Sequence, residues 1–218
     1  RGGRAVRYRR AHASHPHADA KSITGSLAKG LKPSQVVCKI NMDNSKLIYL
    51  HGLESDSNSG KARQFREWFP GMLTPDFKGS FEERMIQLEQ ILEPSRRFSG
   101  KAKLSESNLR DVPQWTIIGS SYGGLMGTVY TCNNPTHVRK LILLAPALLR
   151  EPFGSFLDVQ PASVPVIVIH GTRDDVVPLE PAREVAQALF TKLEYIIVDD
   201  DHRLHKTLHE LDWKKILA

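Results

Sequence analysis

The sequence has only two cysteines, Cys38 and Cys132, among its 218 residues. Two thiols cannot form the disulfide framework of a small secreted domain or a four-thiolate metal site. No uninterrupted apolar run approaches the roughly 20 residues of a membrane-spanning helix. The two longest runs, residues 141–149 and 164–169, are each broken by a proline. We therefore expect a soluble protein without a membrane span, from a reducing compartment, the cytoplasm.

Basic charge is spread unevenly along the chain. Residues 1–40 contain nine Lys and Arg but one acidic residue, whereas the remaining 178 residues contain 21 basic and 23 acidic side chains. The formal net charge of +6 therefore comes from the N-terminal segment. A basic protein can bind the phosphates of nucleic acid. Because the rest of the chain is slightly acidic, we exclude nucleic-acid binding as the main function.

Residues 1–35 lack apolar periodicity and cannot bury enough surface to offset the entropy of ordering. Three interpretations compete: an organellar transit peptide, a functional basic arm, or an extension foreign to the domain. We favour the third, because Met42 stands directly before a polar turn and a strand. Residues 1–41 are thus predicted to be a disordered or non-native extension, with residues 36–40 as an alternative edge strand. Residues 42–218 are predicted to form one domain.

From residue 46 onward, short apolar runs typical of buried strands alternate with segments of helical periodicity. The expected strands are 47–50, 72–77, 115–118, 141–144, 166–169 and 195–198, and the expected helices are 59–69, 81–92, 125–132, 181–190 and 204–216. Ser80 and Glu83 have the spacing of a capping box at the start of the second helix. Such alternation predicts an α/β fold, with a mostly parallel sheet covered by helices on both faces.

The sequence Gly119-Ser120-Ser121-Tyr122-Gly123 stands between an apolar strand and a helix. A G-x-S-x-G motif in this context is typical of a nucleophile elbow. The central serine then has a strained backbone, and glycine at both flanking positions removes Cβ atoms that would collide. We predict Ser121 as a nucleophile. The alternative is a turn rich in glycine and serine that binds phosphate or only joins two elements.

A serine hydroxyl needs a general base, and the base needs an acid that orients it, in the chain order serine, acid, histidine. Asp174 follows a predicted strand and is our choice of acid over Asp175, because Val176 and Val177 resemble inward anchors of the next turn. His202 follows the last predicted strand and is the candidate base, with His205 in reserve. The aspartates at 199–201 either solvate this turn or raise the pKa of the histidine.

Acyl transfer also needs N–H donors for the developing oxyanion. We predict the backbone N–H groups of Tyr122, directly after the nucleophile, and of Leu53, in the loop after the first strand. His51, Gly52 and Phe156 are assigned to the substrate site. We expect the ring of His51 to tie loop ends together rather than to take part in the chemistry.

Metal binding has little support in the sequence. His202 and His205 stand near three aspartates, which imitates a ligand cluster, but no H-E-x-x-H motif or cysteine pair accompanies them. No G-x-G-x-x-G motif follows a strand to indicate a dinucleotide. We predict neither a metal nor a cofactor.

From about residue 46 to 213 the chain resembles an α/β-hydrolase. Residues 49–55, the nearby Ser59, Lys61 and Ala62, and the elbow at 119–124 are similar to the small YqiA-type esterases. The acid loop at 170–178 looks more like that of general hydrolases and lipases. The resemblance implies a Ser121–Asp174–His202 triad that hydrolyses acyl esters, or thioesters, without a cofactor. Only 18 residues separate Pro146 from Pro165, too few for a separate cap domain, so we expect an open site.

The predicted function is hydrolysis of small-molecule carboxylic esters with short to medium acyl chains, through an acyl-enzyme intermediate. The alternatives are a thioesterase or an acyltransferase that uses the same triad, and a non-catalytic binding module that keeps the fold. No oligomeric state follows from the sequence.

Overall fold

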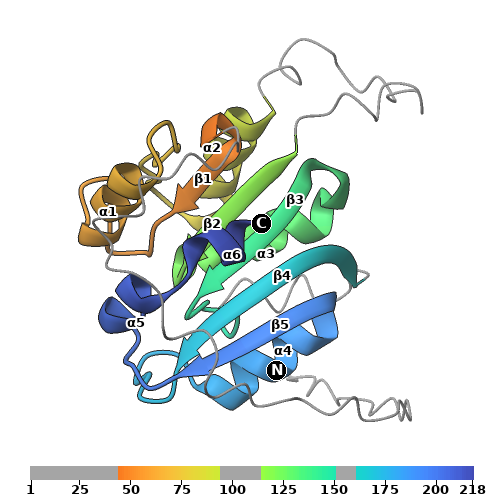
Figure 1. The fold of residues 1–218 in the computed structure, drawn as a ribbon. Helices are drawn as coiled ribbons and strands as arrows, with labels where there is room; N and C mark the ends of the chain where they lie inside the picture. The colour runs from red at the N-terminus through yellow and green to blue at the C-terminus, as the bar shows by residue number, and fades with distance from the viewer. Residues whose placement is uncertain (1–43, 94–113, 151–160) are drawn as a thin grey trace, which may run out of the picture.

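A computed structural model describes residues 44–93, 114–150 and 161–218. Five strands form one sheet in which every neighbouring pair is parallel and the spatial order follows the chain order. The strands are β1 (Leu47–Leu50), β2 (Trp115–Ser120), β3 (Val138–Leu144), β4 (Ala162–Gly171) and β5 (Phe190–Val198). Because all five run the same way, their carboxyl ends lie along one edge of the sheet (Figure 1).

Six α-helices cover the two faces of this sheet (Figure 1). They are α1 (Gly60–Trp68), α2 (Phe81–Leu92), α3 (Tyr122–Asn133), α4 (Leu179–Leu189), α5 (His205–Glu210) and α6 (Trp213–Leu217), with short 3₁₀ helices η2 (Asn44–Lys46) and η5 (Pro135–His137). One apolar core packs α2, α3 and α4 against one face, and a second packs α1, α5 and α6 against the other. This confirms the predicted α/β-hydrolase fold class. The described residues contain no separate cap domain.

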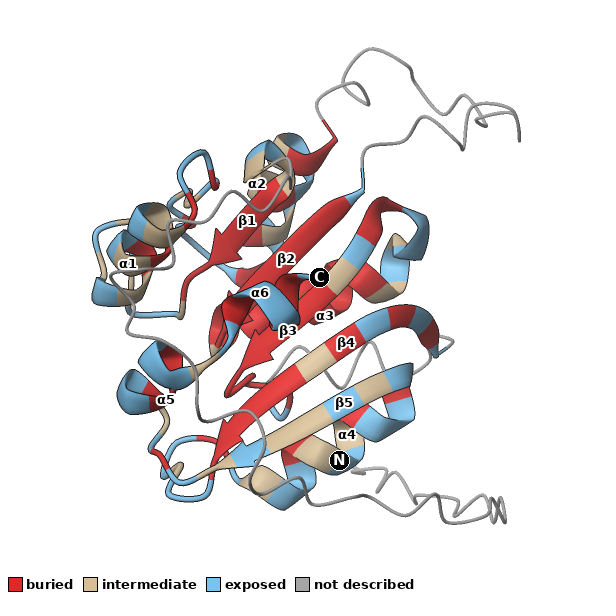
Figure 2. Cartoon of the chain, in the orientation of Figure 1, coloured by how far each residue is buried: buried red, intermediate tan, exposed pale blue. Residues whose placement is uncertain are grey.

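Burial differs between the two edges of the sheet. Every residue of β1, at one edge, and of the neighbouring β2 is buried, whereas most residues of β5, at the other edge, are half-buried or exposed (Figure 2). Strands covered on both faces read as continuous apolar runs rather than as alternating patterns. Within the described ranges, no helix is long and apolar enough to span a membrane.

Helix α2 begins with the predicted capping box. The hydroxyl of Ser80 accepts a hydrogen bond from the N–H of Glu83 at 3.2 Å, and the Glu83 carboxylate accepts one from the N–H of Ser80 at 2.7 Å. These bonds satisfy N–H groups that a helix start leaves without partners. The prediction of this helix, including both of its ends, is confirmed.

The predicted strand at 72–77 is wrong. Leu73 makes an isolated bridge to β1, in which its N–H donates to the carbonyl of Leu47 and its carbonyl accepts from the N–H of Tyr49, both at 2.9 Å. Pro75 follows two residues later and has no N–H with which to continue a ladder. Met72 and Phe77, at the two ends of this segment, still pack into the cores, which contributes to the strand-like pattern.

The closing helix predicted at 204–216 is two helices. Helix α5 ends at Glu210, and α6 starts after Asp212, whose carboxylate accepts a hydrogen bond from the N–H of Lys215. Leu204 has a left-handed backbone with φ of 55°, so it lies outside the helix. Apolar residues of both short helices pack into the same core on one face of the sheet. Their spacing along the sequence therefore resembles that of one longer helix.

Candidate active site

The backbone of Ser121 is strained. It lies between the end of β2 and the start of α3, with φ of 53° and ψ of −115°. Non-glycine residues seldom adopt positive φ, and at functional sites surrounding hydrogen bonds hold them there. Here the Ser121 N–H donates to Leu144 at the end of β3 (2.9 Å), and its carbonyl accepts from the N–H groups of Gly124 (2.9 Å) and Ala147 (3.0 Å).

Two glycines allow β1, β2 and α3 to cross at this point. A Cβ atom on Gly119 would lie 2.5 Å from the carbonyl oxygen of Gly123. A Cβ atom on Gly123 would collide with the carbonyl of Leu50 in β1. No larger side chain fits either position without moving backbone, as the sequence motif predicts.

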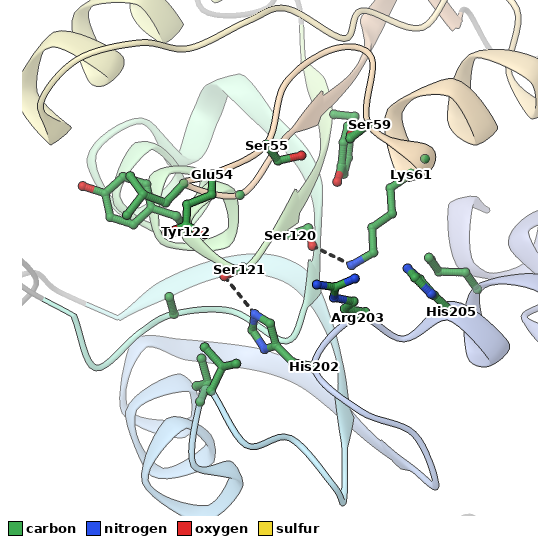
Figure 3. A pocket seen from close by; sticks show the side chains of 18 of the residues that line it. Glu54, Ser55, Ser59, Lys61, Ser120, Ser121, Tyr122, His202, Arg203 and His205 are labelled. Atoms are coloured by element: carbon green, nitrogen blue, oxygen red, sulfur yellow. Dashed lines mark hydrogen bonds between the residues drawn. The ribbon is translucent and has the colours of Figure 1, made fainter.

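Three loops bring Ser121, His202 and Asp174 together. His202 follows β5, and its Nε2 lies 3.0 Å from the Ser121 Oγ (Figure 3). Its Nδ1 lies 2.8 Å from Oδ2 of Asp174, which follows β4. The Asp174 side chain is fully buried, whereas Asp175 is exposed. His205 lines the same cavity but stands at the start of α5, outside these hydrogen bonds.

The Asp174 carboxylate is held in its ionised form. Burial raises its pKa, but hydrogen bonds from the Val177 N–H (2.8 Å), the His202 ring and the Val176 N–H (2.9 Å) outweigh burial and leave the pKa below its ordinary value. Val177 is buried as expected. The prediction of Val176 as an inward anchor is wrong, because 60% of this residue is exposed and it lines the cavity.

A second histidine, His170 at the end of β4, supports the same carboxylate. Its Nε2 lies 3.0 Å from Asp174 Oδ2 and 3.1 Å from the carbonyl of Val177, and its Nδ1 lies 2.7 Å from the Tyr195 hydroxyl. Burial lowers the pKa of His170, and although hydrogen bonds oppose this, the ring stays neutral. A neutral ring that accepts from the tyrosine O–H donates through Nε2 toward Asp174. His170 thus has a structural role, and nothing in the sequence indicated its contact with Asp174.

The three aspartates before His202 fold the loop that carries it. Asp199 forms an ion pair with Arg173. Buried Asp200 accepts two hydrogen bonds from Thr207 in α5, both at 2.8 Å. Asp201 accepts from the N–H groups of residues 203 and 204 at 2.8 and 3.2 Å. These contacts fix the fold of the turn, which goes beyond the predicted role of solvating it.

Leu53 and Tyr122 both line the cavity beside Ser121. Neither of their backbone N–H groups donates a hydrogen bond to another described residue, so both are free to bind an oxygen atom. Gly52 lies so close that a Cβ there would sit 3.6 Å from the Cβ of Ser121. The loop after β1 therefore packs directly against the elbow.

Sequence reasoning missed Arg84, which fixes this loop. Its guanidinium donates to the carbonyl of Leu53 at 3.3 Å and lies over the ring of Tyr122, 5.5 Å from the centroid. Arg84 is buried on the inner face of α2, at helical spacing from Phe81 and Leu88. The sequence did contain a signal for this residue, because Arg84 is an arginine on an otherwise apolar face of the predicted helix.

The structure separates His51 from the cavity. The buried ring accepts a hydrogen bond from the Phe77 N–H through Nε2 (2.9 Å), and its Nδ1 lies 2.7 Å from the carbonyl of Gly52. His51 thus ties two loops together, and its assignment as a substrate-contacting residue is corrected, since it does not line the cavity. Phe156, the other predicted substrate contact, lies outside the described residues.

Ser121 and His202 line a cavity of about 1050 Å³ at the carboxyl edge of the sheet. This position, in a crevice beyond the ends of parallel strands, is where open α/β sheets bind ligands. Among the described residues, no cluster of three or more His, Cys, Asp or Glu side chains is arranged to hold a metal ion.

The sequence model of the family described as phospholipase/carboxylesterase matches residues 28–217. The chain belongs to this family of α/β-hydrolases. The superfamily that the elbow and the first loop indicated is thereby confirmed. The narrower resemblance to YqiA-type esterases stays a prediction.

Solved structures share the fold at low sequence identity. An α/β serine hydrolase homologue from Coxiella burnetii is 16% identical with a TM-score of 0.58, over 79% of this chain and 83% of that one. An esterase from Pyrococcus furiosus, Pf2001, is 18% identical with a TM-score of 0.57, over 80% and 82% of the two chains. The mouse α/β hydrolase domain-containing protein 10 is 16% identical with a TM-score of 0.55, over 79% and 90%. The comparison with curated proteins found no match.

Proposed function

We propose that the protein is a serine hydrolase that cleaves carboxylic esters of short to medium acyl chains through an acyl-enzyme on Ser121. The observation that most supports this proposal is the continuous set of hydrogen bonds from the Ser121 hydroxyl through His202 to the ionised Asp174. Family membership agrees with hydrolysis of this general kind. Esters and thioesters both suit the chemistry.

The proposed reaction has two steps. The Oγ of Ser121 attacks the ester carbonyl while Nε2 of His202 accepts the hydroxyl proton, and Asp174 stabilises the imidazolium that forms. The N–H groups of Leu53 and Tyr122 bind the oxyanion. His202 then protonates the leaving alcohol. In the second step it takes a proton from water, which attacks the acyl carbon; the bond to Ser121 Oγ then breaks, His202 returns the proton to this oxygen, and the carboxylic acid leaves.

The test is the hydrolysis of a p-nitrophenyl ester series, from acetate to decanoate, by the wild type and Ser121→Ala. We expect the substitution to lower kcat by about 10⁴-fold or more, because the nucleophile is lost. Ser120→Ala is the matched control, since its hydroxyl lies beside the site but does not contact His202, and it should retain far more activity. Equal activity of Ser121→Ala and the wild type would contradict the proposal. Product analysis with added alcohols distinguishes hydrolysis from acyl transfer.

A further inference from the structure

The cavity around Ser121 is lined by two chemically different kinds of side chain. Its described lining contains one carboxylate, Glu54, against four side chains of lysine and arginine, which are Lys61, Arg150, Arg203 and Lys206. In Figure 3, Lys61 and Arg203 lie on one side of Ser121 and Tyr122 lies on the other. The lining also contains apolar side chains, which are Leu53, Ala147, Leu149, Val176, Val177 and Leu208. The site thus offers both cationic and apolar groups to one ligand.

Lys61 is turned into the cavity instead of toward bulk solvent. It lies in the first turn of α1, and its Nζ donates to the Ser120 hydroxyl at 3.0 Å. No carboxylate of the described residues forms an ion pair with it. An ammonium has three N–H donors, so it can donate further hydrogen bonds to a ligand. Burial lowers the pKa of Lys61 to about 8, although carboxylates at longer range oppose this effect. Its charge is therefore incompletely compensated by the protein.

Arg203 faces the same space from the opposite loop. It directly follows His202, and its backbone N–H is fixed by Asp201 at 2.8 Å. Its exposed guanidinium makes no ion pair or hydrogen bond within the described ranges. A guanidinium binds the paired oxygens of a carboxylate or phosphate through two parallel hydrogen bonds. Two unpaired cations, one next to Ser120 and one next to His202, therefore stand beside the reacting groups.

We propose that the ester substrate carries an anionic group, a carboxylate or a phosphate, in its alcohol portion, and that this group binds between Lys61 and Arg203. This inference rests on the proposed function. The acyl chain then lies on the side of Ser121 where Tyr122 stands, near Leu53. The alcohol leaves toward His202, which is the side on which Arg203 lies. An anion there gives both cations the partner that the protein does not supply.

Binding can be measured without catalysis. The probes are 4-(hydroxymethyl)benzoate, 4-(hydroxymethyl)phenyl phosphate and the neutral isostere 4-(hydroxymethyl)benzamide, titrated into the full chain by calorimetry. We expect at least one anion to bind about tenfold or more tightly than the amide, as one charge-assisted hydrogen bond provides. Arg203→Gln and Lys61→Gln should each lower the ratio of anion affinity to amide affinity about tenfold. Arg63→Gln, on the exposed side of the same helix α1 and outside the cavity lining, should keep it.

The kinetic arm uses the butyrate esters of the same three alcohols, compared as ratios of kcat/KM. The ratio of anionic to neutral ester should be about ten or more in the wild type and fall about tenfold in Arg203→Gln. Because Arg203 is exposed, this variant should fold, and its melting temperature checks that it does. The outcomes separate this inference from the proposed function. Hydrolysis that depends on Ser121, with similar kcat/KM for the anionic and neutral esters, overturns this inference and leaves the proposed function standing. Selective anion binding without any hydrolysis supports the anion site and overturns the proposed function. Equal binding of all three probes, or an equal loss in Arg63→Gln, overturns the anion site.

Discussion

At the scale of single residues, the site contains charged groups that have lost much of their water. Asp174 is fully buried and remains ionised because N–H groups and two histidine rings surround its oxygens. Among the residues that the structure describes, the Ser120 hydroxyl is the one hydrogen-bond partner of the Lys61 ammonium. Desolvation of a charge favours its neutral form and costs folding free energy. The two charges therefore affect folding in opposite ways. The charge of Asp174 is stabilised by hydrogen bonds within the protein, whereas the loss of water around the Lys61 charge is incompletely offset.

Replacement of Lys61 by methionine should stabilise the fold near pH 7. The pKa of Lys61 falls from 10.5 in the unfolded chain to about 8 in the native state, so that its charged form is penalised on folding. We expect Lys61→Met to raise the free energy of unfolding by about 1–3 kcal/mol, less the lost hydrogen bond.

The pH dependence of this gain has a definite sign. Between about pH 8 and 10.5 the unfolded wild type binds more protons than the native state, so its stability rises and the advantage of the variant shrinks. Urea unfolding at pH 6.5 and pH 9.5 measures both effects. An advantage of Lys61→Met that grows with pH would contradict the assignment.

At the scale of elements, the crossing of β1, β2 and α3 sets the position of the nucleophile. Helix α3 packs against β2 and β3 with glycine at the points of closest approach. The end of β3 then holds the strained Ser121 through Leu144 and Ala147. A small displacement of α3 along this crossing would move the Ser121 hydroxyl away from His202.

Gly123→Ala should be strongly destabilising. The added methyl group would collide with the backbone of Leu50, which cannot move without disturbing β1, and we expect a loss of about 3 kcal/mol or more. Gly60→Ala, at the start of α1, is the control, because nothing lies within 4 Å of its added Cβ. It should be neutral or stabilise by about 0.4–1 kcal/mol. Urea denaturation measures the free energy of unfolding of both variants. Equal values for Gly123→Ala and Gly60→Ala would contradict close packing at the crossing.

Sequence patterns predicted the elements whose local and tertiary signals agree. β2 is a continuous apolar run, and α2 has both a capping box and an apolar face. The strand prediction for 72–77 was wrong because Met72 and Phe77 pack into the cores without a hydrogen-bonded ladder, and an apolar pattern does not report hydrogen bonds. The elbow and the loops after β4 and β5 follow from motif and chain order. Contacts that depend on how loops fold in space, such as those of Arg84 and His170, have no local pattern that specifies their partners.

At the scale of the whole molecule, the basic excess and the described fold lie in different parts of the chain. The first described element, η2, starts at Asn44, and the basic excess lies before it. We propose that residues 42–218 form the catalytic domain and that residues 1–41 are an extension to it. The described parts of the cores on both faces of the sheet are built from residues after position 46.

Removal of residues 1–41 should leave the melting temperature within about 2 °C of the full chain, because residues 1–35 lack the apolar periodicity that a core element needs. Ester hydrolysis should also be unchanged. Thermal unfolding and kcat/KM of the two chains check this. A large fall in either quantity would show that the segment takes part in the fold or the site. The alternative of an edge strand at residues 36–40 predicts such a fall.

The most direct test of the account is covalent labelling by a fluorophosphonate, with the modified residue located by peptide mass spectrometry. We predict a single adduct on Ser121, formed in the wild type and Ser120→Ala and absent from Ser121→Ala. Labelling should be much slower in His202→Ala than in His205→Ala, because only the first imidazole contacts the hydroxyl. An adduct on another residue, or equal labelling of the two histidine variants, would contradict the claim that Ser121, His202 and Asp174 act as one unit.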